Sequence, residues 1–283
     1  MPASQHPLLY VRLPGVLFLV VLFFAPRAIA QEEGPVTFTT EELADGAALL
    51  ATNTGPAPVS VRFEWKLKNT ILVEGDEVAV VPAGGAGVPV ARLRTKRPRK
   101  PASWSFASYA TFGDVTDEEY DEPHAYLLPF GAGESYELSQ GYDGAFSHRG
   151  EYALDFAMPV GTVVTAIRGG VVTDVVERYR RRCPERRCAE YNNYVRVYHD
   201  DGTFATYEHL THEGADVEVG QEIAAGDPIG RSGNTGWTRG PHLHLSVYLP
   251  GFQERRTVPV IFWTGEGEEA QRLVEGEVYA RRS

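Results

Sequence analysis

The chain has 283 residues, of which 43% are hydrophobic and 23% are charged, a balance typical of folded globular proteins and not of disordered ones. At about 150 residues per domain, this length predicts two domains. The formal net charge of −11 argues against nucleic acid as a general partner, because proteins that bind phosphate backbones present basic surfaces.

The first 30 residues have the features of an export signal. Residues 16–25 (VLFLVVLFFA) form an apolar run after Arg12, and residues 28–30 (AIA) provide a small-x-small cleavage site. The run is shorter than the roughly 20 residues that span a bilayer, so we expect cleavage and no stable membrane span afterwards. An uncleaved membrane anchor is the alternative. Cleavage removes two Arg and no acidic residue, which changes the net charge from −11 to −13. The expected location is the periplasm or cell envelope, or the extracellular space.

Residues 31–112 show the period of two that is typical of strands. Residues 59–67 alternate between apolar and polar side chains, and shorter strands are expected at 71–73, 78–81 and 103–112. Proline and glycine lie between these segments. Short strands separated by turns predict a small β-sandwich of immunoglobulin-like architecture.

Two charged stretches follow this pattern. Residues 92–100 (RLRTKRPRK) contain six basic residues in nine positions, which favours a solvated loop; contact with an anionic polymer is the alternative. Residues 113–126 contain six acidic residues and few large apolar side chains, which predicts an acidic linker.

Residues 127–263 are rich in short segments with β-branched and aromatic side chains. No internal repeat and no sustained helical period is visible, so we expect an all-β chain that ends in a tail at residues 264–283. Residues 200–202 (DDG) predict a hairpin turn. The expected strands are residues 162–166, 170–176, 194–199, 203–209 and 242–249.

Cys183 and Cys188 are the only cysteines. In an exported chain, two cysteines separated by four residues predict a local disulfide. A metal-binding pair is the alternative, although no further Cys or His lies nearby in sequence.

Two histidines one residue apart lie in the segment GPHLHLSVY, residues 240–248. In a strand, His242 and His244 project to one face, while Leu243 and Leu245 project to the other. A solvated pair on an exposed face is the simplest interpretation, unless other ligand-type residues converge on it.

Candidates for convergence are His148, Asp155 and His209. A catalytic zinc ion takes three protein ligands from His, Asp and Glu and leaves one position for water. Three histidines and a carboxylate on strands of one sheet are enough to build such a site.

The motifs around these residues resemble one known family. They are H-x-G…D-F-A-x-P-x-G-T-x-V, then Y-x-H-L, then G-Q-x-I-A-A-G-D-x-I-G-x-S-G-N-T-G…G-P-H-L-H, in this order over residues 141–248. They resemble the lysostaphin-type (LytM-like) zinc endopeptidases of bacterial cell walls. The resemblance implies a LytM-like antiparallel β domain over residues 127–263.

The resemblance also implies the roles of individual residues. His148, Asp155 and His244 would bind one Zn²⁺ per chain, and His209 and His242 would be the catalytic histidines, acting as general base and as donors. The implied reaction is hydrolysis of peptide bonds in peptidoglycan stems or cross-links. No feature of the sequence specifies an oligomeric state.

The sequence departs from the family at one spacing. The family has His-x-x-x-Asp, whereas six residues separate His148 from Asp155, and the usual position falls on Tyr152, a poor zinc ligand. We predict a three-residue insertion after Gly150 and an intact site. The altered spacing leaves a non-catalytic envelope factor that activates other wall hydrolases as an alternative, and a wall-binding protein dominated by the first domain as a further one.

The remaining candidates lie near these motifs or outside them. Residues 230–240 hold four glycines, which predicts a flexible wall that an extended peptide can approach closely. Trp237 in this wall would contact substrate or anchor the loop. We expect His124, His199 and His212 to be surface or strand-end residues.

Overall fold

The structure is a computed structural model that describes residues 11–13, 16–18, 35–264 and 270–282. The predicted export signal lies outside these residues, except for two paired three-residue strands, β1 (Val11–Leu13) and β2 (Val16–Phe18). The chain divides into two compact units, Met1–Phe112 and Gly113–Ser283. Within the described residues the only helix is the 3₁₀ helix η1 (Arg186–Tyr191), so the all-β fold class is confirmed. None of the described residues belongs to a helix with the length and hydropathy needed to cross a membrane.

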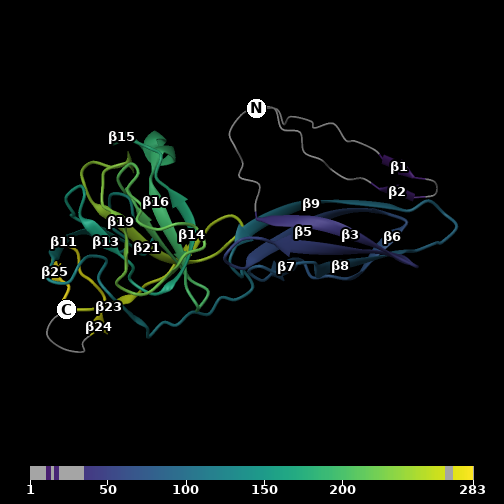
Figure 1. Ribbon diagram of the computed structural model, residues 1–283, viewed down its shortest axis with the longest axis horizontal. Helices are drawn as coiled ribbons and strands as arrows, with labels where there is room; N and C mark the ends of the chain where they lie inside the picture. Colours follow the sequence, from purple (N-terminus) through teal and green to yellow (C-terminus); the bar gives the residue numbers. More distant parts are fainter. Residues whose placement is uncertain (1–10, 14–15, 19–34, 265–269, 283) are drawn as a thin grey trace. The chain divides into compact units, whose positions relative to one another are not determined.

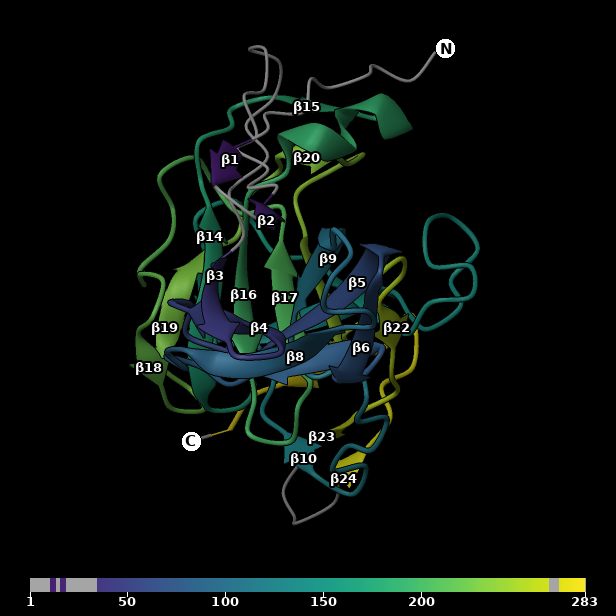
Figure 2. The same cartoon turned by 90° about the vertical axis from the view of Figure 1, so that its right-hand side faces the viewer.

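Besides the β1-β2 pair, the first unit contains two antiparallel sheets, with strand orders β3-β4-β8-β6 and β7-β5-β9 (Figure 1). Their bounds are β3 (Val36–Leu43), β4 (Gly46–Asn53), β5 (Val59–Lys68), β6 (Thr70–Glu74), β7 (Val78–Val81), β8 (Val88–Thr95) and β9 (Ser103–Phe112). Figure 2 shows β4, β8 and β6 side by side.

One apolar core joins these two sheets. The alternation of β5 buries Val59, Val61 and Phe63, which pack in one cluster with Leu49 of β4 and Val90 of β8. The predicted strand at residues 59–67 is therefore confirmed. The immunoglobulin-like assignment stays a prediction.

The second unit is built around a nine-stranded sheet with the order β18-β14-β16-β17-β21-β12-β11-β25, in which β22 also pairs with β21. Its strands are β11 (Ser135–Gln140), β12 (Ala153–Phe156), β14 (Gly170–Val176), β16 (Tyr194–Tyr198), β17 (Phe204–Glu208), β18 (Glu222–Ile223), β21 (Leu243–Leu249), β22 (Arg256–Thr257) and β25 (Val278–Ala280). β16 and β17 pair antiparallel across residues 200–202, which confirms the predicted hairpin.

One face of this sheet packs on the main core of the unit. Leu243, Leu245 and Val247 of β21 are at most 2% exposed and lie in one cluster with Phe156 and Tyr207. Because side chains alternate along a strand, His244 projects to the opposite face, as the sequence predicts.

Smaller sheets complete the second unit: β10-β23-β24, β13-β19 and β15-β20. Their bounds are β10 (Ala125–Tyr126), β13 (Val163–Thr165), β15 (Arg182–Cys183), β19 (Pro228–Arg231), β20 (Gly236–Trp237), β23 (Ile261–Trp263) and β24 (Ala270–Gln271).

Both segments expected to be irregular make specific contacts in this unit. In the acidic segment 113–126, the Asp121 amide donates to Asp201, and the Arg256 side chain donates to the Glu118 carbonyl. In the segment 264–283, β25 pairs with β11 at an edge of the large sheet.

Candidate metal centre

Three neighbouring strands place three functional side chains in a row. β21 lies between β17 and β12, and the cross-strand partners of His244 are Glu208 on β17 and Asp155 on β12. Residues directly opposite each other in an antiparallel ladder have Cβ atoms about 4.5–5.5 Å apart and project to the same face. The ladder itself therefore brings Asp155 against His244.

His148 reaches the same place from a loop. The amide of His148 donates to the Gly144 carbonyl, and the amide of Glu151 donates to the His148 carbonyl, over 3.1 and 2.8 Å. Gly150 has a φ of 75°, which favours glycine, and its amide donates to the Asp143 side chain over 2.8 Å. The residues after Gly150 thus continue from a tight, hydrogen-bonded turn, and His148 is fully buried.

The donor atoms of the three predicted metal ligands converge. His148 Nε2 lies 3.2 Å from His244 Nδ1 and 3.2 Å from Asp155 Oδ1, and His244 Nδ1 lies 2.9 Å from Asp155 Oδ1. Ligand atoms about 2.0–2.1 Å from a tetrahedral zinc ion are separated by roughly 3.3 Å, so these distances fit such an ion. His148 also donates its Nδ1 proton to the Gly141 carbonyl over 3.0 Å, which orients the Nε2 lone pair toward the other two donors. This is the only such cluster that the described residues contain.

The charges of these groups support one another. Burial raises the pKa of Asp155, but the hydrogen bonds with His148 and His244 and the charges of His244 and His242 outweigh burial and hold this pKa well below its ordinary value. Burial lowers the pKa of His244, whereas its hydrogen bond with Asp155 and the charges of Asp155 and Glu208 raise it, with a net increase. A carboxylate that stays ionised is available as a metal ligand.

Gln140 clamps the other carboxylate oxygen of Asp155. Its Nε2 donates to Asp155 Oδ2 over 3.2 Å and to Ser147 Oγ over 2.7 Å, and its Oε1 accepts the amides of Phe146 and Ser147. One buried side chain thus connects Asp155 on β12 with the loop that carries His148. The sequence analysis did not identify Gln140, because a glutamine at the end of a strand has no signal of its own.

The two predicted catalytic histidines are adjacent. The rings of His209 and His242 have centroids 4.5 Å apart, and His242 Nε2 lies 3.7 Å from Asp155 Oδ1. His209 donates its Nδ1 proton to the Thr235 carbonyl over 2.7 Å, and His242 donates to the Gly240 carbonyl over 2.8 Å. In the neutral form, both rings therefore keep the Nε2 lone pair for chemistry.

Burial keeps His209 neutral. Desolvation, followed by the nearby His242 and His244, lowers the pKa of His209 to about 4. A neutral imidazole at neutral pH can accept a proton. His209 also has a φ of 65°, and its amide donates to Asn192 Oδ1 over 2.9 Å, so Asn192 holds its backbone while the Thr235 carbonyl holds its ring.

Glu208 is a further residue that the sequence analysis did not identify. Asn192 Nδ2 donates to its carboxylate over 2.5 Å, and Arg255 lies 3.4 Å away. Burial raises the pKa of Glu208, but the charges of His244, Arg255, His209 and Arg196 lower it to about 2. Only its position opposite His244 on the neighbouring strand marks Glu208 as part of the site. That position depends on strand register, which the sequence alone does not specify.

These side chains line one cleft with a volume of about 550 Å³. Asp155, His209, His242 and His244 contribute to its lining, as do residues of the glycine-rich wall. In that wall Gly233 allows close packing, because a Cβ atom there would lie 2.6 Å from the backbone of Leu210 and Thr211. Trp237 lines the cleft and also anchors the wall, since its Nε1 donates to the Pro184 carbonyl over 2.9 Å.

Three other histidines do not line this cleft. His199 directly follows β16, is fully buried and donates its Nδ1 proton to the Gly169 carbonyl over 2.8 Å. His212 contacts the carbonyl of Glu177, and His124 lies 3.7 Å from the Asp121 carboxylate. His148 does not line the cleft either, but it contacts Asp155 and His244 directly, whereas these three histidines are bonded elsewhere.

Comparisons with known proteins find relatives of part of the second unit. Residues 149–257 match the model of Peptidase family M23. An uncharacterized metalloprotease of Buchnera aphidicola is 34% identical over 96 residues, which are 34% of this chain and 22% of that protein. The peptidoglycan DD-endopeptidase ShyA of Vibrio cholerae is 37% identical over 97 residues, which are 34% of this chain and 20% of that protein.

The chain thus spans about a fifth of the length of these curated relatives. Among solved structures, the catalytic domain of the antimicrobial peptidase lysostaphin from Staphylococcus simulans is 28% identical, with a TM-score of 0.32, over 42% of this chain and 83% of that one. The predicted resemblance to the lysostaphin-type family is confirmed by the match of residues 149–257, which lie in the second unit, to the model of Peptidase family M23.

Proposed function

We propose that the protein is an exported zinc-dependent endopeptidase that hydrolyses peptide bonds in the stems or cross-links of peptidoglycan. The observation that carries this proposal is the convergence of His148 Nε2, Asp155 Oδ1 and His244 Nδ1 within 4.8 Å of one another, at a cleft whose lining includes Asp155, His244, His209 and His242. Two relatives, a peptidoglycan DD-endopeptidase and lysostaphin, support the substrate class.

One zinc ion per chain would be held by His148, Asp155 and His244. When bound there, it would lower the pKa of water and polarise the scissile carbonyl group. The two neutral imidazoles and one carboxylate leave the ion with a net positive charge, which favours both effects.

The other residues of the cleft would move the proton and stabilise charge. His209 is neutral and offers Nε2, so we assign it the role of the base that accepts a proton from the attacking water. His242 lies beside it and would stabilise the negative charge that develops on the carbonyl oxygen. Gln140 would orient Asp155, and the charge of Glu208 opposite His244 would raise the pKa of that histidine.

The alternative of a non-catalytic envelope factor depends on the longer spacing between His148 and Asp155. The turn at Gly150 and the clamp of Gln140 bring both donor atoms to the same place in spite of that spacing, which favours hydrolysis. The first unit would then position or regulate the peptidase.

The test is incubation of the zinc-loaded full chain with purified peptidoglycan, followed by mass spectrometry of the released fragments. We expect new peptide termini that are absent after chelation and from the His244→Ala protein. The non-catalytic factor would instead be supported by two results together. This chain alone would leave the wall intact in all samples, and a second wall hydrolase would digest the wall faster in the presence of this chain than in its absence.

A further inference from the structure

We propose that a disulfide-closed arginine loop at the rim of the cleft, together with Arg239, binds carboxylate groups of the peptide that enters the cleft. We define the arginine loop as residues 177–191. The inference rests on the proposed function and deepens it, since it specifies substrates that carry free carboxylates near the scissile bond.

The arginine loop concentrates positive charge on an acidic chain. It contains six arginines and three glutamates, whereas the whole chain has 38 acidic and 27 basic residues. The arginines are Arg178, Arg180, Arg181, Arg182, Arg186 and Arg187, and all six are exposed. A positively charged loop on a negatively charged chain is not needed for solubility. It is what recognition of an anionic group requires.

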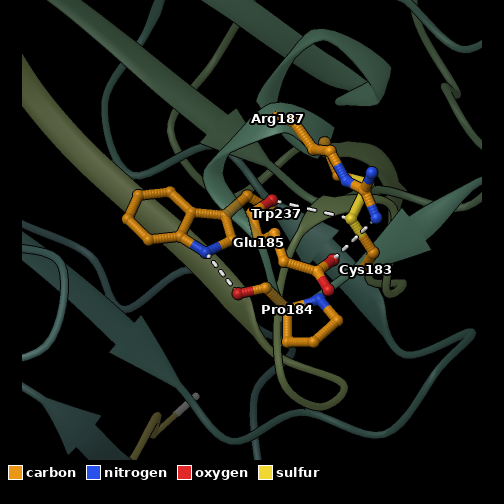
Figure 3. The surroundings of a disulfide bond; sticks show 6 residues. Cys183, Pro184, Glu185, Arg187 and Trp237 are labelled. Carbon is orange, nitrogen blue, oxygen red and sulfur yellow. Dashed lines mark hydrogen bonds and ion pairs between the residues drawn. A yellow bond between two sulfur atoms is a disulfide. The ribbon is translucent and has the colours of Figure 1, made fainter.

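Backbone pairing joins the arginine loop to the wall of the cleft. β15 pairs in parallel with β20, the Gly236 amide donates to the Arg181 carbonyl over 2.9 Å, and the Thr238 amide donates to the Cys183 carbonyl over 3.1 Å. Figure 3 shows the Trp237 indole donating to the Pro184 carbonyl beside the disulfide. Two residues after Trp237 comes Arg239, and both side chains line the cleft.

The disulfide fixes the part of the loop between residues 183 and 188, which carries Arg186 and Arg187. Cys183 and Cys188 are bonded, as the sequence predicts, and Cys188 is fully buried under the turn. A loop that is already ordered loses less conformational entropy when it binds a ligand. The loop is therefore preorganised at the entrance to the site.

Most of the positive charge in the arginine loop is not neutralised internally. Arg180, Arg182 and Arg186 have no side-chain hydrogen bond or ion pair with any described residue. Arg187 lies 3.8 Å from the Glu185 carboxylate, a long and exposed ion pair (Figure 3). Arg181 is stacked 4.4 Å from the Tyr191 ring, which holds the guanidinium in place but leaves its charge unpaired.

Arg239 extends this charge into the cleft. Its guanidinium lies 3.8 Å from the centre of the Phe146 ring, and Phe146 in turn lies 5.8 Å from the ring of Trp237. A guanidinium stacked on a ring still presents its in-plane N–H groups, and two of them match the two oxygens of a carboxylate. A peptide bound in the cleft would thus contact Arg239 with the part nearer to the scissile bond. Its more distant part would contact the arginine loop at the rim.

The test compares native peptidoglycan with peptidoglycan whose carboxyl groups have been amidated chemically. The variant is Arg180→Ser/Arg182→Ser/Arg186→Ser in the full chain, and Arg239→Ser is measured separately. The matched control is Arg94→Ser/Arg97→Ser/Arg99→Ser, which removes the same charge from the basic stretch of the first unit. We expect the loop variant to raise KM for native soluble fragments about tenfold with kcat unchanged, and to leave KM for amidated fragments as it is in the wild type.

A second variant separates charge from shape. Cys183→Ser/Cys188→Ser keeps every arginine but frees the loop, so we expect a smaller rise in KM for native fragments and none for amidated ones. Circular dichroism of the variant would verify that the domain remains folded.

Binding is also measured by co-sedimentation of the zinc-loaded chain with intact wall. We expect the wild type to pellet more with native than with amidated wall, and the loop variant to lose this difference.

Equal pelleting and equal KM with both materials would overturn the inference while hydrolysis continued. If the wild type still pelleted more than the loop variant with amidated wall, the arginine loop would be binding phosphate groups and not carboxylates. That result would also overturn the inference. Absence of hydrolysis by the wild type on both materials would overturn the proposed function alone, since pelleting still tests the arginine loop.

Discussion

The two halves of the candidate metal centre are built in different ways. Asp155 and His244 lie opposite each other in the ladder of β12 and β21, so backbone hydrogen bonds of the sheet fix their separation. His148 lies in a loop, and side-chain hydrogen bonds from Gln140 and Asp143 hold that loop. The strand half therefore has little tolerance for insertion, whereas the loop half accepts extra residues as long as its clamps are kept.

The strand half should be the most sensitive to substitution. We expect His244→Ala to lose the metal and to reduce hydrolysis of peptidoglycan to the background rate, because it removes a donor that no neighbour replaces. His212→Ala is the matched control, since His212 does not line the cleft. Hydrolysis retained in purified His244→Ala would contradict the assignment.

His209 should separate chemistry from metal binding. Because its ring donates to a backbone carbonyl and not to a donor of the metal site, His209→Ala should keep one zinc ion per chain. We expect kcat to fall about 10²–10⁴-fold, the usual contribution of a general base. Zinc content and kcat are measured on the same preparation, and an unchanged kcat would exclude His209 as the base.

Gln140 should report on the loop half alone. Gln140→Ala leaves Asp155 Oδ2 and the amides of Phe146 and Ser147 without their partner, so we expect zinc affinity to fall about 10–100-fold in a folded protein. Competition with a chelator measures this affinity. Gln221→Ala, an exposed glutamine outside the cleft, is the control. If both variants bind zinc equally well, the clamp does not position the ligands.

His199 should affect stability and not activity. Burial lowers its pKa to about 4, so the unfolded chain binds a proton at higher pH than the folded chain does. Its contribution to the free energy of unfolding is therefore complete above about pH 6.5 and is lost as the pH falls toward 4, with a loss of roughly 2 kcal/mol at pH 5.

Urea denaturation at pH 7.5 and pH 5 measures this effect. We expect wild type to lose roughly 2 kcal/mol more than His199→Asn between these values, with kcat unchanged at pH 7.5. Equal losses would show that the pKa of His199 is the same in the folded and unfolded states.

The strand half of the centre is also the part that sequence pattern predicts best. Alternation along residues 242–249 places His244 on the face of the strand away from the core and Leu243 and Leu245 on the face toward it. The burial of both leucines agrees with this prediction. The strand that carries Asp155 is harder to predict, because all four residues of β12 are buried and no alternation remains.

The loop half depends on contacts that no local pattern contains. Gln140 precedes Asp155 by 15 residues and is brought to it by the pairing of β11 with β12, which includes a register shift between Leu138 and Gln140. Glu208 likewise becomes a neighbour of His244 only through strand register. Positions such as these follow from tertiary pairing, which periodicity along one segment does not specify.

The zinc content of the purified full chain and of His148→Ala, measured by elemental analysis after loading and desalting, tests the central claim most directly. We expect about one zinc ion per chain in the wild type and none retained in His148→Ala, because the loop half supplies a donor in spite of its longer spacing. A wild-type chain without zinc, or a His148→Ala chain that retains the full amount, would contradict it.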